Sequence, residues 1–481
     1  MHTVAQPAHA GADAERLAAV FALQKQHCVA DPCPPLQARR AGLRSLRRQI
    51  RRYQDVLAAA MHADFGSRPQ AESKMLDLLG SVLQIDHALG KLRGWMKPSR
   101  RSTELLFLTN SLAVHYQPKG VVGIVVPWNF PVYLALGPLT AALAAGNRVM
   151  LKMSEMAPAT TCAVRRMLAE IFPEHQVAVF GAELTDPGSF TALAFDHLIF
   201  TGSPAVGREV MRSAARNLTP VTLELGGKSP ALVGRSYPVR DAALRIAHGK
   251  IANSGQICVA PDYALVPRER MDEFVAGLRA AFDTFQPSSQ PHLDVVSIVN
   301  ERHHARLQGL LDDARARGAT VLSCAQPHDT RRMALQIVLG CRPEMAIMQE
   351  EIFGPVLPVL AYDRIEEAIE LVGRRERPLA LYLFSRDAAE QRTVLGQTRS
   401  GGVTINDWGW HVINHDAPFG GTGHSGIGSY HGAEGFRELS HARTVFKRHR
   451  FFPVGLFYPP YGNWVQRLTL RYYLGKADPD L

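Results

Sequence analysis

The chain has 481 residues, of which 46% are hydrophobic and 20% are charged. This length exceeds one ordinary core, so we expect two or three domains, and the composition is that of a globular rather than a disordered protein. Gly, Pro or Asn interrupts the apolar stretches before they reach the ~18 residues that a membrane span needs, and residues 1–16 contain no apolar signal region. These features predict a cytoplasmic protein with no transmembrane segment.

The formal net charge of +10 raises the question of a nucleic-acid partner. Leu43, Leu46, Ile50 and Leu57 follow helical spacing, which predicts an amphipathic helix with a basic face in solvent; an acidic surface or a membrane is the alternative partner for that face. The sequence lacks a basic patch interleaved with aromatic residues, so we expect no nucleic acid. The basic face comprises Arg39, Arg40, Arg44, Arg47, Arg48, Arg51 and Arg52.

The six cysteines are scattered rather than clustered. Cys28 and Cys33 form a close pair, but no second pair completes a zinc site, so no metal is expected. The spacing is also unlike the dense disulfide framework of a small secreted domain. Reduced thiols are therefore expected, and one of them is free to do chemistry.

The order of predicted elements indicates an α/β fold. Residues 14–95 read as largely helical, and the tail at 451–462 is expected to be irregular. Between them, strands alternate with helices, which predicts an open, mostly parallel sheet followed by a second α/β region. The expected strands are 121–126, 148–153, 176–180, 197–201, 221–225 and 263–267; the expected helices are 133–145, 159–171, 206–215, 240–253, 270–285 and 301–317; a strand–helix pair is expected over 356–372.

Two residues stand out as candidates for chemistry. Cys258 follows the helix expected at 240–253 across a glycine-containing turn, where a thiol can be exposed, although a lone cysteine is more often inert core. Glu224 lies in an apolar strand that runs into two glycines, and burying a carboxylate there is costly unless it is paired. It is either bonded to neighbouring backbone amides or a general base with a raised pKa.

Three further strings lie where open α/β sheets bind ligands. Gly202 to Gly207 closes a strand and opens a helix, so a pyrophosphate could approach the helix amides, although such glycine pairs are common. Asn129 lies where the first strand ends, and Lys152 with Glu155 lies where the next strand ends, both at the carboxyl edge of the sheet. Each has a plain alternative: Asn129 as a turn former, and Lys152 with Glu155 as a surface pair.

Taken together, these strings resemble the aldehyde dehydrogenase superfamily from about residue 20 to about residue 450. The compact spacing and the ending of the chain resemble its class 3 branch and, within that, the coniferyl aldehyde dehydrogenases. The matching strings are PWNFP (127–131), LKMSE (151–155), FTGSPAVG (200–207), LELGGKSP (223–230), NSGQIC (253–258), EEIFGPV (350–356) and PFGGTGHSG (418–426).

The resemblance implies an architecture. Residues 1–98 and 119–225 would form the dinucleotide-binding domain, and 226–424 the catalytic domain. Residues 99–118 and 425–481 would supply a small bridging or oligomerisation sheet and the tail of a homodimer.

The resemblance also implies roles in the NAD-dependent oxidation of an aldehyde, with NADP possible. Cys258 would be the nucleophile that passes through a thiohemiacetal and a thioester, Glu224 the base that activates water, and Asn129 an oxyanion donor. The implied cofactor-binding set is Trp128, Lys152, Glu155, Gly202, Ser203, Gly207, Gly226, Glu351 and Phe353; the implied substrate walls are Trp408, Trp410 and Phe419, joined by Trp128.

Several readings compete with this one. A medium- or long-chain fatty aldehyde is the alternative substrate to an aromatic aldehyde. A CoA-acylating enzyme would lack the water-activating carboxylate, which Glu224 provides here. A cofactor-independent cysteine hydrolase or acyltransferase would need a histidine beside Cys258, and the sequence has none between His248 and His292. A non-catalytic scaffold would not need Cys258, Glu224 and Asn129.

Overall fold

The computed structural model describes residues 8–286, 295–325 and 331–475. These residues form two compact units: one comprises the chain up to residue 95 together with 117–440, and the other comprises 96–116 and the segment from 441 onward. The first unit contains both larger sheets, so the expected separation into a dinucleotide-binding and a catalytic domain stays a prediction.

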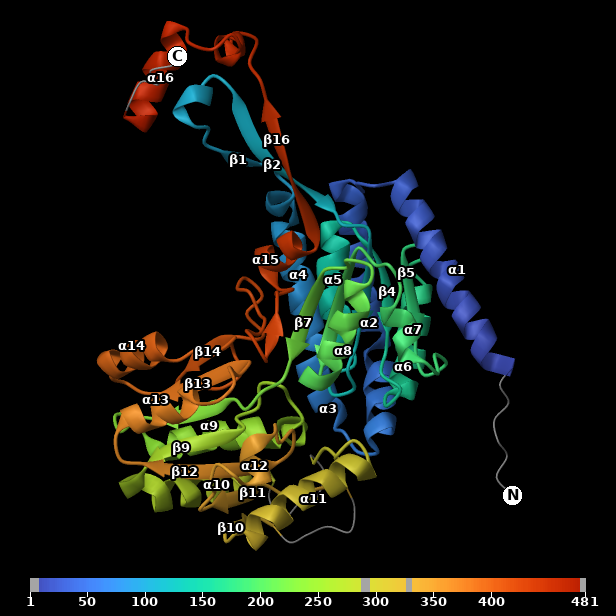
Figure 1. The fold of residues 1–481 in the computed structure, drawn as a ribbon. Coiled ribbons are helices and arrows are strands. Elements are labelled where there is room, and N and C mark those ends of the chain that lie inside the picture. The colour runs from blue at the N-terminus through green and yellow to red at the C-terminus, as the bar shows by residue number, and fades with distance from the viewer. Residues whose placement is uncertain (1–7, 287–294, 326–330, 476–481) are drawn as a thin grey trace. The chain divides into compact units, whose positions relative to one another are not determined.

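A six-stranded sheet carries one half of the first unit (Figure 1). Its strands run parallel except for the short edge strand β15, which is antiparallel to β7. Since parallel strands end at a common edge, the residues that follow β3, β4, β6 and β7 meet there. In spatial order the strands are β15 (Gly426–Ile427), β7 (Val221–Leu225), β6 (His197–Gly202), β3 (Val121–Val125), β4 (Arg148–Lys152) and β5 (Val177–Phe180).

Helices cover both faces of this sheet. Helix α5 (Tyr133–Ala145) packs on β3 and β4, and all of its residues are buried, as expected for a helix that is apolar all round. The opposite face of the sheet packs against α1 (Ala8–Ala30), α7 (Pro187–Thr191) and α8 (Pro204–Ala215) in one apolar cluster.

A seven-stranded sheet forms the second half of the first unit. It is parallel except for the edge pair β10 and β11, so the predicted mostly parallel α/β fold is confirmed. In spatial order its strands are β10 (Thr320–Ser323), β11 (Gln336–Leu339), β12 (Val356–Tyr362), β9 (Tyr263–Pro267), β8 (Pro230–Val233), β13 (Ala380–Phe384) and β14 (Gly402–Ile405).

The second unit is built on a three-stranded sheet in the order β1 (Ser99–Arg101), β2 (Ser111–Pro118) and β16 (Ser440–Lys447). Most of β16 is exposed, including the apolar Phe446. The tail is not wholly irregular, since a helical turn at Val454–Phe457 precedes the helix α16 (Trp464–Leu474), which the sequence did not predict.

The remaining helices agree with most sequence expectations. Among the described helices, none combines the length and apolarity needed to cross a membrane. Their bounds are α2 (Leu36–Phe65), α3 (Gln70–Ser73), α4 (Leu79–Trp95), α6 (Pro158–Ala169), α9 (Val239–Ile251), α10 (Met271–Phe285), α11 (Glu301–Ala316), α12 (Ala346–Gln349), α13 (Ile365–Gly373), α14 (Ala388–Gln397) and α15 (Gly432–Glu438).

The basic face expected over residues 39–52 needs one correction. Leu43, Leu46 and Ile50 on α2 are buried as predicted. Arg39, however, is only 6% exposed and donates to the carbonyl groups of Ala144 and Ala145 at the end of α5. It therefore caps a helix instead of facing solvent.

Candidate active site

A strained turn places Cys258 after α9. The helix ends at Ile251 rather than at residue 253 as predicted, and Asn253 and Ser254 have φ values of 45° and 50°. Gly255 continues the turn in contact with Gly354, where a Cβ atom would lie 2.4 Å from the Gly354 carbonyl oxygen. Non-glycine residues held at positive φ concentrate at functional sites, so the turn directs attention to the thiol that follows it.

Two cavities meet at Cys258, which is half-buried. The first, of about 1150 Å³, opens along the carboxyl edge of the six-stranded sheet. The second, of about 840 Å³, is walled almost entirely by apolar and aromatic side chains. Cys258 and Leu134 line both cavities, so a group held in one can react at the same sulfur as a group held in the other.

The sheet-edge cavity brings together most of the predicted catalytic and cofactor residues. Phe353, with φ of 52°, lies against Trp128 at a ring-centroid distance of 5.4 Å. A Cβ atom at Gly226 would lie 1.9 Å from Glu351 Oε2, so glycine is needed for the carboxylate to cross the backbone there. The predicted residues that line this cavity are Trp128, Asn129, Gly202, Ser203, Glu224, Gly226, Cys258, Glu351 and Phe353.

Three predicted cofactor residues do not line the cavity. Lys152 is buried at the end of β4, donates to the Met153 carbonyl (2.9 Å) and lies 3.6 Å from Glu155, whose side chain is largely exposed. Gly207 serves helix packing, because a Cβ atom there would lie 2.8 Å from a methyl group of Leu225. Their predicted contacts with a cofactor stay predictions.

The apolar cavity contains three of the four predicted substrate walls, whereas the fourth, Trp128, lines the sheet-edge cavity. Trp408 and Phe419 wall it, and Trp410, which is 55% exposed, lies at its solvent side. His248 lines the same cavity as Cys258, but its Nδ1 already accepts a hydrogen bond from Trp408 Nε1 (3.0 Å). The sequence did not single out Tyr133 and Tyr430, which also line this cavity and are themselves almost fully buried.

Burial controls the protonation of the reactive groups. Glu224 is 3% exposed, and neither of its carboxylate oxygens has a hydrogen-bond partner among the described residues, so its pKa lies well above the usual value. Burial and the nearby Asp262 raise the pKa of Glu351 to about 8. Burial, with Glu351 and Glu224 close by, raises the pKa of Cys258 to about 12. Burial therefore makes the thiol harder to ionise than a free thiol, and Glu224, whose pKa burial also raises, is suited to general-base work once it is ionised.

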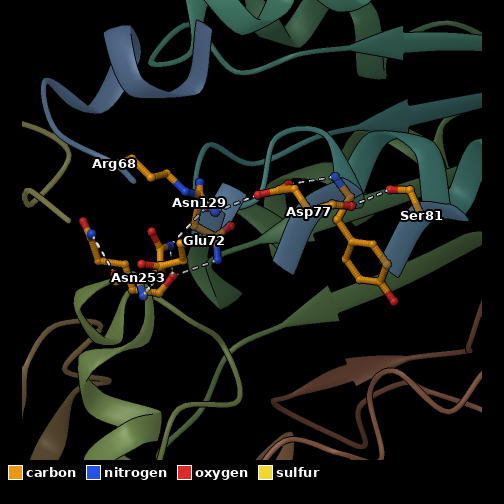
Figure 2. A network of polar contacts seen from close by, with 8 residues as sticks. Arg68, Glu72, Asp77, Ser81, Asn129 and Asn253 are labelled. Atoms are coloured by element: carbon orange, nitrogen blue, oxygen red, sulfur yellow. Dashed lines mark hydrogen bonds and ion pairs between the residues drawn. The ribbon is translucent and has the colours of Figure 1, made fainter. Parts of the chain in front are cut away.

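A buried polar network holds Asn129 in place (Figure 2). Its side-chain Nδ2 donates to the Gln256 carbonyl (3.1 Å), and its own carbonyl accepts from Arg68 Nη1 (3.0 Å) and Asn253 Nδ2 (3.1 Å). Arg68 in turn pairs with Asp77 at 2.6 Å, and both side chains are fully buried. The network therefore fixes Asn129 against the turn that carries Cys258.

Sequence reasoning missed the supporting residues of this network. Glu72 accepts from the Asn253 amide (2.5 Å), and Asp77 accepts from the Tyr133 amide (2.9 Å) at the start of α5. Arg68 lies just before α3, Glu72 lies within α3, and Asp77 lies in the helical segment Lys74–Leu78 that follows. The polar residues of this stretch read as surface. No local sequence signal indicates that the stretch folds under the active site.

Replacing Arg68 with methionine should destabilise the protein strongly, because it leaves Asp77 buried and uncompensated. Removing one partner of a buried pair typically costs about 3–5 kcal/mol. Urea unfolding measures the loss, and the double variant Arg68→Met, Asp77→Leu should recover much of it. The matched control is Arg47→Met, whose pair with Asp86 is open to solvent and should matter little. Equal losses for Arg47→Met and Arg68→Met would contradict the importance of the network.

A cluster of histidines packs behind the apolar cavity. His431 is fully buried, neither ring nitrogen has a partner among the described residues, and its ring lies 5.3 Å from those of His415 and Phe419. Burial, helped by the neighbouring histidines, lowers the pKa of His431 to about 3. Over the described residues no group of three or more His, Cys, Asp or Glu is arranged to hold a metal.

His431 should make the fold sensitive to acid. The unfolded chain takes up a proton near pH 6.5 and the folded chain only near pH 3, so stability is present above pH 6.5 and is lost as the pH falls below it. At about pH 5 the cost is about 2 kcal/mol for this one group. The variant His431→Leu should reduce the difference in unfolding free energy between about pH 7.5 and about pH 5 by that amount. His441→Leu, at an exposed position, is the control, and equal pH dependence of the His431 variant and wild type would refute the assignment.

Comparison with known proteins decides the family. The profile of the aldehyde dehydrogenase family matches residues 2–445. The chain belongs to the aldehyde dehydrogenase family. It is 48% identical, over 95% of its length and 96% of the relative, to a "probable coniferyl aldehyde dehydrogenase" of Pseudomonas aeruginosa. It is 38% identical to "aldehyde dehydrogenase family 3 member B2" of Mus musculus, over 90% of each chain.

A solved structure of the family has the same fold. The Mycobacterium tuberculosis aldehyde dehydrogenase complexed with NAD+ superposes with a TM-score of 0.81 at 28% identity, covering 90% of each chain. The predicted family, its class 3 likeness and the α/β fold are therefore confirmed, and this aldehyde dehydrogenase is an oxidoreductase. The alternative of a cofactor-independent cysteine hydrolase is not favoured.

Proposed function

We propose that this aldehyde dehydrogenase oxidises an aromatic aldehyde, of the coniferyl aldehyde type, to the carboxylic acid through a thioester on Cys258. The observation that carries the proposal is the position of Cys258 where the apolar cavity meets the sheet-edge cavity. The aldehyde reaches the sulfur from the apolar side. The names of the relatives support an aromatic substrate, as does the aromatic lining with Trp408, Phe419 and Tyr430.

The chain's own residues fit a nicotinamide dinucleotide in the sheet-edge cavity. Glu351 Oε1 is buried without a partner among the described residues, an acceptor that suits a ribose hydroxyl. Ser203 caps α8, and the amides that begin this helix suit a pyrophosphate beside Gly202. A bound NAD supplies the hydride acceptor for the oxidation. The Glu155 carboxylate beside Lys152 favours NAD over NADP, because a 2′-phosphate would meet a like charge, although NADP stays open.

The reaction steps follow from the residues around Cys258. Its sulfur bonds to the aldehyde carbon as the thiol proton passes to solvent water, and the side-chain amide of Asn129 with the Cys258 backbone N–H stabilises the oxyanion. Loss of hydride from that carbon leaves a thioester. Glu224 then takes a proton from water as the water oxygen attacks the thioester carbon. The C–S bond breaks, and the acid leaves as the sulfur takes up a proton and restores the thiol.

The test is steady-state kinetics with an aldehyde panel. NADH formation is followed with coniferyl aldehyde, benzaldehyde, hexanal and acetaldehyde, with and without CoA. We expect kcat/KM for the aromatic aldehydes to exceed that for acetaldehyde by several-fold to about a hundred-fold, since ring contacts add ~0.5–1.5 kcal/mol beyond area burial. A preference for hexanal over both aromatic aldehydes would favour a fatty aldehyde enzyme instead, and a dependence on CoA would overturn hydrolysis by Glu224.

We also infer a homodimer and a cytoplasmic location. The second unit exposes apolar side chains, among them Phe446, Trp464 and Tyr472. Together with the family resemblance, this exposure supports a role for these side chains as contacts with a partner subunit. Sedimentation analysis tests the dimer, and a monomer at micromolar concentration would exclude it. The described cysteines are free thiols, which agrees with a reducing compartment.

A further inference from the structure

A second polar cavity lies at the opposite edge of the six-stranded sheet. It has a volume of about 670 Å³ and opens where β4 and β5 begin, whereas the active site lies where the parallel strands end. Helix α5 ends beside it at Ala145 and helix α2 begins beside it at Leu36. Its lining includes Asp31, Ala38, Arg39, Gly146, Arg148 and His175.

Two buried arginines face this cavity without a carboxylate partner. Arg39 is 6% exposed and Arg148 is 8% exposed, and neither forms an ion pair among the described residues. Within the described part of the chain, Arg148 Nε is buried with no hydrogen-bond partner, and Nη1 makes only long contacts, 3.9 Å to Cys28 Sγ and 3.4 Å to the Asp31 carbonyl oxygen. Arginine is almost never fully buried unless it is paired. The exposed Asp31 attracts Arg39 electrostatically, but no carboxylate of the described residues forms an ion pair with either guanidinium group.

Arg39 stays charged at neutral pH. It donates to backbone carbonyl groups, from Nε to Pro34 (2.8 Å) and from Nη1 to Ala144 (3.0 Å) and Ala145 (2.7 Å). These bonds neutralise the carboxyl end of α5, which would otherwise repel an anion at this place. Burial lowers the pKa of Arg39 only to about 10, so its charge is retained.

The remaining charges near the cavity leave its lining positive. Asp31 is the acidic residue of the lining; it is exposed, and its backbone carbonyl rather than its carboxylate contacts Arg148. His175 stacks on His27 at a ring distance of 3.9 Å, and burial, with His27 and Arg148 nearby, lowers its pKa. The 30-residue helix α2 begins here without a side-chain cap, so its first amides also favour an anion.

We propose that this cavity binds a small oxyanion of the phosphate class, held between Arg39, Arg148 and the first turn of α2. Guanidinium groups bind phosphate through paired charge-assisted hydrogen bonds, and a dianion would form the ion pairs that neither arginine makes among the described residues. The cavity is larger than inorganic phosphate requires, so an organic phosphate monoester also fits. The site is separate from the one that we assign to the pyrophosphate of NAD, and the proposal does not depend on the reaction catalysed.

The test measures binding to the full-length protein with NAD at saturation, so that the sheet-edge cavity is already filled. Inorganic phosphate and glycerol phosphate are titrated by calorimetry and by thermal unfolding, against sodium chloride at matched ionic strength. We expect a saturable rise in Tm and measurable heat with phosphate and no such response to chloride. Tighter binding of glycerol phosphate would identify an organic ester as the preferred form, and equal binding would identify the phosphate group alone as the determinant.

Ala38 offers a matched pair of variants. It is exposed in the first turn of α2, where a glutamate favours the helix, and it lines the cavity. Ala38→Glu should abolish the phosphate response by placing a carboxylate in the cavity, while Ala38→Gln should keep it. Arg148→Gln should weaken binding by about tenfold or more, through loss of a charge-assisted contact. A wild-type response no larger than that to chloride, or an unchanged response in Ala38→Glu, would overturn the proposal.

Discussion

Replacing Cys258 with alanine is expected to lower kcat by a factor of about a thousand or more, because no other thiol of the described chain lines the two cavities. Affinity for NAD should change by no more than about twofold, since the sulfur contributes to the chemistry rather than to dinucleotide binding. Steady-state kinetics measure the first quantity, and fluorescence titration with NADH measures the second.

Cys162→Ala is the matched control for this experiment. Cys162 is exposed on α6, lines neither cavity, and its loss should leave kcat unchanged. If Cys258→Ala oxidised aldehydes at a rate comparable to wild type, the covalent mechanism would be wrong. If it lost NAD binding as well, the thiol or its turn would have a structural role that the two-cavity arrangement does not include.

The sequence predicted those parts of the fold whose signals are local. Strands such as 121–126 and 197–201 are short β-branched or apolar runs bounded by turn residues, and they appear within a residue or two of their expected bounds. The run that forms β13 (Ala380–Phe384) was missed, since a short apolar run suits a buried helix as well as a buried strand. Strand β8 begins with a proline, which weakened its signal.

The site was predictable where its residues sit in motifs and unpredictable where tertiary contacts create it. Cys258 and Glu224 follow recognisable strings, whereas Arg68 becomes important only because folding brings it under Asn129, about sixty residues away in the chain. Arg39 is a similar case, because a basic helical face looks solvent-exposed until the end of another helix packs against it. Long-range burial of charged residues has no local pattern, so it required the structure.

Replacing Glu224 with glutamine is expected to separate the two halves of the reaction. The amide keeps the size of the side chain but cannot take a proton from water, so the thioester should accumulate. Rapid mixing should show a burst of NADH close to about one equivalent per site, followed by turnover slowed by about a hundred-fold to ten-thousand-fold. Wild type should show no such stall.

The pH dependence sharpens this experiment. A base acts only when it is ionised, and burial raises the pKa of Glu224, so the hydrolysis rate of wild type should rise with pH through that raised value. Glu224→Gln should lose this limb of the profile. Glu351→Gln is the comparison: its carboxyl is also buried with a pKa raised to about 8, but its variant should raise the KM for NAD without a stalled burst. Full steady-state activity of Glu224→Gln would remove Glu224 from the role of base, and loss of the burst itself would place it in the activation of Cys258.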